Sequence, residues 1–406
     1  MSEFPLIAPV RQHLTEQAIA DPYAYTRAAL ESSALPARVH AGMAVAVGVG
    51  SRGIGCIQPV VRATLDTLTA HGARPFLVPA MGSHGGGTAA GQREVLHGYG
   101  LGDLGAPIHS DMEAVEIGRT AGGMPVFFDR FAAEADAVMV VNRIKPHTSF
   151  RAKWESGLMK MLAVGMGKRQ GAATYHAWGI GDALPAAGEV VMATLPVLGG
   201  VAIVENGRHQ PAVIEALTAD ELWTREPDLL QEAWTHLPTI PLAPLDLLVL
   251  REIGKDISGT GMDLNVVGMW RRSGGPVEPA IARLAVLDLT PNSHGNGIGV
   301  GYADVIPQAL RDKIDWPATY TNCLTSANFN GAKVPITLPD VRSTIVTALP
   351  SLEPADARMV IARNTLDLEE LWVSQALLAD VARAPQLEQI GDLRPLRFDA
   401  HGNLQL

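Results

Sequence analysis

Three basic side chains each follow an apolar segment of the sequence, and two of them, His84 and His147, lie in loops of small or proline residues. Arg52 lies in VGVGSRGIG, His84 in GSHGGGT and His147 in NRIKPHTSF. Because imidazole titrates near neutral pH, two facing histidines can take a proton from one face of a substrate and return one to the other. Arg52 can bind a carboxylate or phosphate through two parallel hydrogen bonds. An incidental histidine in a tight turn and a surface arginine are the alternative interpretations.

A second candidate group lies in SGLMKMLAVGMGKRQGAATYH, residues 156–176. Lys160 has apolar neighbours, and burial favours the neutral, nucleophilic form of an amine. The alternative is an amphipathic helix from which Lys160 extends to water. His176 closes the segment, and Lys168 is predicted to be a solvated or phosphate-proximal charge.

Strands that alternate with helices are predicted to position these residues. The strands are expected at residues 41–50, 73–81 and 133–142, the helices at residues 56–72 and 89–102, and a hairpin arm at residues 121–128. Such alternation indicates a mainly parallel, Rossmann-like sheet. Ligands of these sheets bind beyond the carboxyl ends of the strands, where Arg52, His84 and His147 are expected.

Prolines in THLPTIPLAP, residues 235–244, indicate a domain boundary. We predict an N-terminal catalytic domain over residues 1–240 and a smaller C-terminal α/β domain over residues 241–406. The predicted fold class is therefore α/β, with two α/β domains and an active-site cleft between them. In the second domain, strands are predicted at residues 245–253 and 282–290 and helices at residues 340–349 and 368–384.

Composition excludes several classes of protein. The 406 residues are 47% apolar and 18% charged, a balance typical of a globular protein with two domains. A net charge of -10 argues against general affinity for nucleic acid or an anionic membrane surface. The two cysteines, Cys56 and Cys323, fit a reducing compartment. With no signal-peptide pattern and no apolar run of about 18 residues, a cytoplasmic protein without a membrane span is expected.

Two glycine-rich loops approximate a dinucleotide-binding loop. Neither GVGSRGIG nor HGNGIGVG has the acidic residue expected at the end of the following strand. An NAD-type oxidoreductase is therefore a disfavoured alternative. A non-catalytic protein that binds an anionic small molecule is another; it would need Arg52 but not Lys160 and His176 together. Without HExxH or paired CxxC motifs, a metal site built wholly from protein ligands is not expected.

The order of these motifs resembles the nickel-dependent lactate racemase family. The resemblance rests on the strand-end arginine, the GSH loop, GRTAGGMPVFFDRFAAEADAVMVVNRIKPH, SGLMKMLAVGMGK and a histidine 16 positions after Lys160. It covers most of residues 40–180 and continues more weakly in the C-terminal half. The resemblance implies nickel and a nickel-pincer nucleotide, pyridinium-3,5-bisthiocarboxylic acid mononucleotide, made by cofactor-biosynthesis proteins and held by the N-terminal domain.

The resemblance also implies roles for individual residues. Lys160 matches the lysine that carries the cofactor covalently, and His176 matches the nickel ligand. His84 and His147 match the acid/base pair, and Arg52 the arginine that holds an anionic group of substrate or cofactor. The implied reaction inverts the α-carbon of a small-molecule 2-hydroxy acid by proton-coupled hydride transfer through a transient 2-oxo acid.

The sequence departs from the family pattern around the substrate. Val49 replaces an aspartate of the lactate enzymes, and in GTGMDLNVVGMWRR Gly268 and Arg271 replace a glutamine and a lysine. Arg271 keeps a positive charge and is predicted to bind substrate, whereas Gly268 predicts a roomier pocket for a longer or polyhydroxylated acid. Racemase and epimerase activities both remain open. Five further residues are expected either to line the cleft or to form turns: Asp263, Asn265, Ser293, His294 and Asn296.

Overall fold

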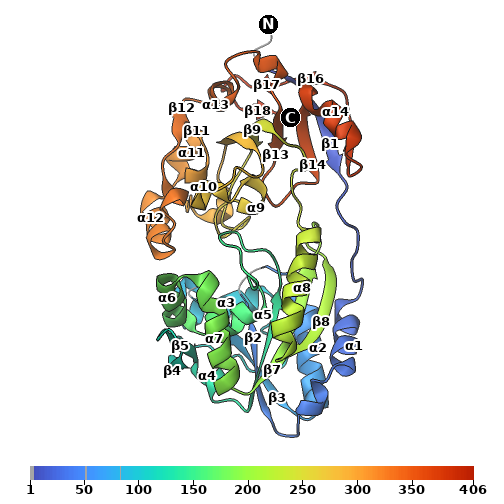
Figure 1. The fold of residues 1–406 in the computed structure, drawn as a ribbon, viewed down its shortest axis with the longest axis vertical. Helices are drawn as coiled ribbons and strands as arrows, with labels where there is room; N and C mark the ends of the chain where they lie inside the picture. Colours follow the sequence, from blue (N-terminus) through green and yellow to red (C-terminus); the bar gives the residue numbers. More distant parts are fainter. Residues whose placement is uncertain (1–3, 51–52, 83) are drawn as a thin grey trace. The chain divides into compact units, whose positions relative to one another are not determined.

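The computed structural model describes residues 4–50, 53–82 and 84–406, with the backbone alone at residues 176, 180, 182 and 325. The chain forms two compact units (Figure 1). The N-terminal unit is Thr15–Leu237, and the C-terminal unit combines Pro238–Leu406 with the residues before Thr15. The predicted boundary after residue 240 assigned the first residues to the N-terminal domain. Instead, β1 (Leu6–Gln12) pairs with β14 (Glu370–Ser374) in the C-terminal unit.

A five-stranded sheet forms the centre of the N-terminal unit, in the order β3-β2-β6-β7-β8. Its strands are β2 (Ala44–Val49), β3 (Arg74–Pro79), β6 (Ala137–Arg143), β7 (Val197–Glu205) and β8 (Pro211–Thr218). Only β8 is antiparallel to its neighbour, which confirms the predicted mainly parallel sheet. The crossover direction reverses between β2 and β6, which is the position where such sheets bind ligands.

Helices cover both faces of this sheet (Figure 1). They are α1 (Pro22–Ser32), α2 (Ile57–Ala70), α3 (Ala89–Gly98), α5 (Leu158–Lys160), α6 (Lys168–Trp178), α7 (Ile180–Thr194) and α8 (Glu221–His236). Alternation along β2 explains the layers: Val45 and Val47 pack with the α2 side chains, whereas Ala46 packs in the core cluster of α5, α7 and α8. The unit is therefore a three-layer α/β/α fold.

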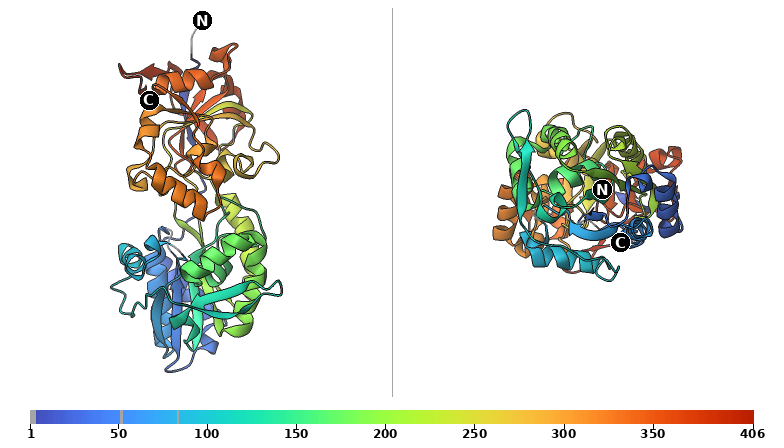
Figure 2. Two further views of the ribbon diagram at one scale, coloured as in Figure 1. Left: turned by 90° about the vertical axis from the view of Figure 1, so that its left-hand side faces the viewer. Right: turned by 90° about the horizontal axis from the view of Figure 1, so that it is seen from below.

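The predicted hairpin arm lies outside the main sheet. It consists of β4 (Ala114–Arg119) and β5 (Pro125–Asp129), followed by the short α4 (Arg130–Ala133). The hairpin contacts α6 and α7, on the helical layer of one sheet face (Figure 2). Its last residue, Asp129, accepts a hydrogen bond from the backbone N–H of Ala132 and so begins α4.

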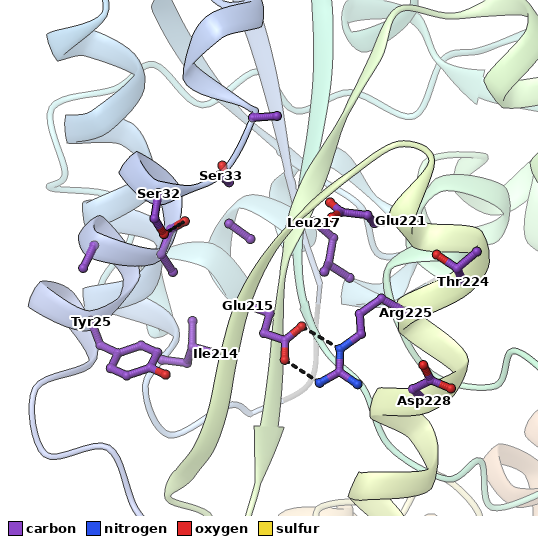
Figure 3. A pocket seen from close by; sticks show the side chains of 14 residues that line it. Tyr25, Ser32, Ser33, Ile214, Glu215, Leu217, Glu221, Thr224, Arg225 and Asp228 are labelled. Carbon is purple, nitrogen blue, oxygen red and sulfur yellow. Dashed lines mark hydrogen bonds and ion pairs between the residues drawn. The ribbon is translucent and has the colours of Figure 1, made fainter.

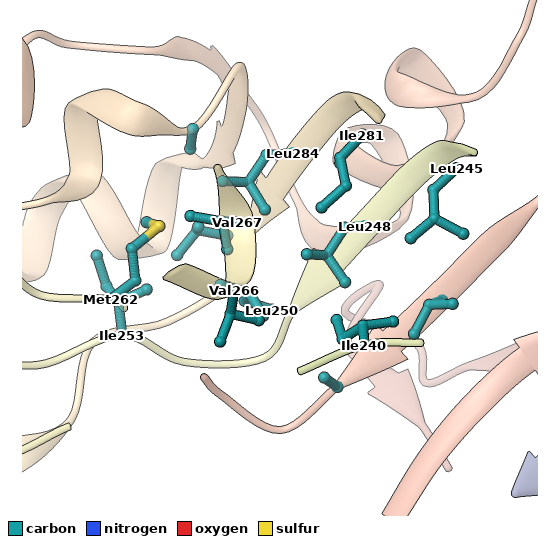
Figure 4. Packing of buried hydrophobic residues seen from close by; sticks show 14 of the residues in the cluster. Ile240, Leu245, Leu248, Leu250, Ile253, Met262, Val266, Val267, Ile281 and Leu284 are labelled. Carbon is teal, nitrogen blue, oxygen red and sulfur yellow. The ribbon is translucent and has the colours of Figure 1, made fainter. Parts of the chain in front are cut away.

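The C-terminal unit contains a larger mixed sheet in the order β12-β11-β10-β9-β13-β14-β1-β15, with β16 on β1. Its further strands are β9 (Leu245–Leu250), β10 (Ile281–Val286), β11 (Val305–Pro307), β12 (Ile336–Leu338), β13 (Met359–Ala362), β15 (Leu387–Gln389) and β16 (Arg394–Pro395), and a separate pair is β17 (Arg397–Phe398) with β18 (Leu404–Gln405). The helices are α9 (Leu264–Val267), α10 (Trp270–Ser273), α11 (Gln308–Lys313), α12 (Trp316–Thr325), α13 (Val341–Ala348) and α14 (Leu378–Arg383). Leu248 and Leu250 of β9 pack on Leu284 of β10 and on Val266 of α9 (Figure 4).

One predicted helix in the C-terminal unit is wrong. Residues 368–384 were expected to be helical, but the first part is the strand β14 and only Leu378–Arg383 forms α14. Leu371 and Val373 are fully buried, at the two-residue spacing of a strand, and β14 pairs with both β13 and β1. The helix predicted at residues 340–349 is present as α13, begun by the side chain of Asp340.

Within the described part of the chain, no helix combines the length and the apolar character that crossing a bilayer requires. Cys56 and Cys323 are both buried and both free thiols.

Candidate functional site

The carboxyl edge of the N-terminal sheet brings the predicted histidine loops together. His84 follows β3 and His147 follows β6, and both strands are parallel neighbours of β2. Their following loops therefore leave the same edge of the sheet, on either side of the end of β2. Arg52 follows β2 in sequence but lies outside the described residues.

The loop that contains His147 is closed at its base. Lys145 and Ser156 form an isolated antiparallel bridge, with backbone N–H to O distances of 2.9 and 3.3 Å. Inside the loop the His147 and Phe150 ring centroids lie 4.2 Å apart, with 31° between the ring planes. The backbone N–H of Ser149 donates to Nδ1 of His147 at 3.1 Å. These contacts hold the imidazole in one orientation.

Lys160 lies near the same aromatic ring. Its Nζ is 6.0 Å from the centroid of Phe150, and its side chain is half-buried. His147 and Lys160, which the sequence analysis singled out separately, therefore both lie near the ring of Phe150. The sequence analysis did not single out Phe150. Its position three residues after His147 was the signal that could have indicated it.

Glu155 connects these residues and was also missed. Its buried carboxylate accepts hydrogen bonds from the backbone N–H of His147 at 2.5 Å and of Ala152 at 3.2 Å. Burial raises the pKa of Glu155, while those hydrogen bonds and the charges of Arg151 and Lys160 oppose the rise. Glu155 thus interacts electrostatically with Lys160, and its two hydrogen bonds stabilise the loop that contains His147.

The helix that carries Lys160 begins on a second buried carboxyl group. Glu226 of α8 accepts a hydrogen bond from the backbone N–H of Met159 at 3.0 Å. Burial raises the pKa of Glu226 to about 8, although hydrogen bonds from Met159 and Leu158 lower it. A Cβ built on Gly157 would overlap Oε1 of Glu226, so a side chain at position 157 would displace that buried carboxyl group or the backbone.

A π-helix, Met161–Gly165, follows Lys160 directly. Its Met166 N–H donates to the carbonyl of Met161 at 2.8 Å, the wider turn that often occurs at functional sites. The glycine loop before His84 packs on this segment, because Gly82 N–H donates to the Gly165 carbonyl at 3.0 Å. The buried Gln92 amide then holds the loop by donating to the carbonyls of Gly82 and His84, at 2.9 and 3.3 Å.

His176 lies in α6 by its backbone, and its side chain is outside the described part of the structure. Ala172, one turn earlier in α6, lies next to the glycine loop: a Cβ built on Gly82 would be 3.4 Å from its Cβ. The helix that bears the predicted nickel ligand therefore packs beside the loop that bears His84. The neighbouring Tyr175 is fully buried, and burial raises the pKa of its hydroxyl group.

The prediction for Lys168 is wrong. Its side chain is fully buried rather than solvated, with Nζ 2.8 Å from Oδ2 of Asp129. The same ammonium donates to the carbonyl of Pro79 at 2.8 Å. An internal ion pair and a strand-end carbonyl replace the solvent or phosphate that was expected, so Lys168 is a structural residue.

In the C-terminal unit, Arg271 is already engaged by protein groups. Its side chain is 3% exposed, and the guanidinium donates to the carbonyls of Tyr302 and Ile281 at 3.1 and 3.2 Å and pairs with Asp304 at 3.1 Å. Nε donates to a fourth acceptor, the carbonyl of Val267, at 3.2 Å. These contacts use four of the five N–H groups of an arginine, which leaves one for the predicted role in binding substrate unless a present contact breaks.

The space beside Gly268 is filled. Gly268 has a φ of 108°, and a Cβ at this position would overlap the indole ring of Trp270. The lack of a side chain at position 268 therefore accommodates Trp270 and does not by itself enlarge a pocket.

The other polar residues of this unit have local structural contacts. Asp263 begins α9 by accepting from the N–H of Asn265, and Asn296 accepts from the N–H of Ile298. Ser293 shares a hydrogen bond with Thr290 at 2.8 Å, and His294 takes a left-handed conformation at a φ of 47°. These contacts are those of turns and caps.

A surface groove of about 910 Å³ lies elsewhere in the N-terminal unit, between α1, the edge strand β8 and α8 (Figure 3). Tyr25 and Ser32 line one side, and Arg225 and Asp228 the other. Arg225 is held by Glu215 through two hydrogen bonds of 2.9 and 2.5 Å. None of the residues predicted to carry chemistry lines this groove.

The fold of this chain is also found in a solved structure. The chain is similar in structure to the lactate racemase apoprotein from Thermoanaerobacterium thermosaccharolyticum, with a TM-score of 0.55 and 14% sequence identity over 88% of this chain and 94% of that one. No protein-family model and no curated protein matches the sequence. At this identity the similarity establishes a lactate-racemase-like α/β fold.

Proposed function

We propose that this protein is an isomerase, a racemase or epimerase that inverts the α-carbon of a 2-hydroxy acid with a nickel-pincer nucleotide. The observation that carries the proposal is the placement of both Lys160 and His147 beside the ring of Phe150. The loop of His84 packs on the segment that follows Lys160. The lactate-racemase-like fold supports the same assignment.

The residues present fit the proposed cofactor. A half-buried primary amine at Lys160, on a helix whose start is fixed by Glu226, suits covalent attachment. Among the residues with described side chains, no three His, Cys, Asp or Glu groups gather as an all-protein metal site would require. A nucleotide that supplies most nickel ligands itself needs one protein nitrogen, for which we propose His176. When bound, the nucleotide supplies an organic electron acceptor whose properties nickel tunes.

The protein groups would orient the acid and handle its proton. We propose that an imidazole of the His84 and His147 pair accepts the hydroxyl proton, and that Arg52 binds an anionic group. Because Trp270 fills the space beside Gly268, the proposal covers 2-hydroxy acids as a class. Preference for a longer or polyhydroxylated acid stays a prediction, and faster turnover of lactate across a series of acids would contradict it.

The direct test uses protein produced together with cofactor-making enzymes. Intact mass spectrometry and a nickel assay are expected to find an adduct and bound metal in the natural protein and in Lys153→Ala, but no adduct in Lys160→Ala. Lys153 is a matched control because it is exposed and seven residues away in the same segment. Natural protein with neither adduct nor nickel would overturn the proposal.

The two alternatives give different results in the same preparation. An NAD-type oxidoreductase would bind NAD in an absorbance titration. A non-catalytic binding protein would bind an anionic small molecule without turning it over, and Lys160→Ala would leave that binding unchanged.

A further inference from the structure

We infer that Gln92 is a positioning residue for His84: its buried amide fixes the backbone of the glycine loop that carries this histidine. The inference rests on the proposed function, in which His84 is one of the two acid/base histidines. The side chain of Gln92 is fully buried in α3, so Gln92 acts through the loop and not through contact with the substrate.

The loop that carries His84 has little rigidity of its own. Four glycines in it have φ values between 56° and 67°: Gly82, Gly85, Gly86 and Gly87. Glycine loses more conformational freedom on folding than any other residue, so a glycine-rich loop keeps one conformation only where other groups hold it. His84 is exposed and takes its position from this backbone.

The loop lies on the first turn of α3. The backbone N–H of Thr88 donates to the carbonyl of Gly85 at 3.4 Å, and the Thr88 side chain accepts from the N–H of Gly91 at 3.1 Å. A Cβ on Gly85 would be 2.7 Å from the backbone N of Gln92, and a Cβ on Gly91 would be 2.0 Å from the carbonyl oxygen of Gly85. This close packing places the loop within reach of the Gln92 side chain.

The amide of Gln92 binds two carbonyl groups of the loop. Its Nε2 donates to the carbonyl of Gly82 at 2.9 Å and to the carbonyl of His84 at 3.3 Å. Carbonyl oxygens only accept, so these two contacts determine which end of the amide faces the loop. One side chain thus holds the loop both at Gly82 and at His84 itself.

Gly82 is also held through its own N–H. This group donates to the carbonyl of Gly165, the last residue of the π-helix that follows Lys160. Gly82 is therefore tied to α3 through Gln92 and to the segment after Lys160 through Gly165. The Gln92 amide thereby helps to set the position of the His84 loop relative to the lysine that we propose carries the cofactor.

The burial of Gln92 indicates that the amide serves the loop and not the core. The buried positions of α3 are Gln92 and Leu96, spaced as on the apolar face of a helix, where a hydrophobic residue is expected. The Oε1 atom of Gln92 has no hydrogen-bond partner among the described residues. A buried acceptor without a partner lowers stability. The two hydrogen bonds to the loop are therefore the physical reason for an amide at this position.

The hold on the loop can be measured in the apoprotein. Gln92→Met has a similar volume and no N–H donor, so the amide hydrogens of residues 82–88 should exchange with solvent at least about tenfold faster than in the natural protein. Gln58→Met is the matched control, because Gln58 is exposed and donates to a single carbonyl, that of Gly100, at 3.4 Å. Equal exchange of the loop in the two variants would overturn the inference.

Thermal unfolding separates a positioning role from a role in the core. The melting temperature of Gln92→Met should stay close to that of the natural protein, because the substitution removes an unpaired buried acceptor together with the two donors. Leu96→Ala, which truncates the other buried side chain of α3, should lower it clearly. An equally large drop in Gln92→Met would identify Gln92 as a core residue and contradict the inference.

The natural protein offers a measurement that does not depend on the folding of a variant. In NMR spectra of the apoprotein, both Nε2 hydrogens of Gln92 should exchange slowly with solvent, whereas those of the exposed Gln58 should exchange fast. Fast exchange at Gln92 would show that its amide does not hold the two carbonyls.

Activity of the loaded enzyme tests whether the position of the loop matters for the reaction. A misplacement of about 1 Å can cost about 10²-fold in rate, so kcat of Gln92→Met should fall by about 10-fold to 10²-fold. KM, the adduct on Lys160 and the nickel content should match those of the natural protein, because Gln92 contacts neither cofactor nor substrate. A loosened loop with an unchanged kcat would rule out the positioning role. Natural protein without an adduct would refute the proposed function, whereas the exchange experiments would still decide whether Gln92 holds the loop.

Discussion

The ammonium of Lys168 lies 2.8 Å from the carboxylate of Asp129, and both side chains are fully buried. The pair joins the end of β5 to the first residue of α6, and the Pro79 carbonyl at the end of β3 accepts from the same ammonium. Burial raises the pKa of Asp129 against the opposing charge of Lys168. This internal contact holds the helix of the predicted nickel ligand to the sheet edge.

Removing one member of this pair should destabilise the fold strongly. Lys168→Met leaves a buried carboxylate without its counter-charge, which typically costs about 3–5 kcal/mol. Urea denaturation measures the loss. The double variant Lys168→Met with Asp129→Leu should recover much of it, since neither charge is then buried. A loss below about 1 kcal/mol in the single variant would show that the pair contributes little.

Glu226 should make stability depend on pH. Its folded pKa of about 8 lies above the ordinary value of about 4.3, so the folded state holds a proton that the unfolded state has lost between these values. The free energy of unfolding should therefore fall as pH rises from about 4.3 to about 8, by up to about 1.4 kcal/mol per pH unit.

Glu226→Gln removes this titration, so its stability relative to the natural protein should increase with pH across the same window. Urea denaturation at several pH values makes the measurement. Glu94→Gln, which removes an exposed carboxylate, is the control. Parallel pH profiles for the natural protein and Glu226→Gln would contradict the prediction.

Gly157→Ala should displace the start of the Lys160 helix. The added Cβ would overlap Oε1 of Glu226, so either the carboxyl group or the backbone must move. We expect a destabilisation of about 1–3 kcal/mol by thermal or urea unfolding, the usual cost of overpacking. Gly98→Ala in α3 is the matched control: nothing lies within 4 Å of its Cβ position, and it should be neutral or slightly stabilising. Equal behaviour of the two variants would exclude this steric explanation.

Gly268→Ala tests the packing of Trp270. Its φ of 108° disfavours any L side chain, and its Cβ would overlap the indole. The variant should lose about 1–3 kcal/mol of stability and change the tryptophan signal in near-ultraviolet circular dichroism. An unchanged spectrum with unchanged stability would mean that the indole does not occupy this space.

Local patterns in the sequence were sufficient to predict many of the helices and strands of the N-terminal unit. Apolar runs and glycine stops predicted β2, β3, β6, α2 and α3, because each pattern depends on neighbours within about one turn or one strand. The order of these elements also placed His84 and His147 after strands of one parallel sheet, and hence at one edge. Their chemical roles and those of Lys160, His176 and Arg52 remain proposals.

Only the tertiary structure decided which distant residues these segments contact. Lys168 pairs with Asp129, 39 positions away, and so is buried although its local sequence suggested a solvated charge. Residues 370–374 form a strand because β13 and β1 supply hydrogen-bond partners on both sides, which a helical spacing of apolar residues cannot reveal. Periodicity along a chain reports which face of an element is apolar, whereas the partner of a charge or a strand depends on contacts between distant segments, and these exist only once the chain has folded.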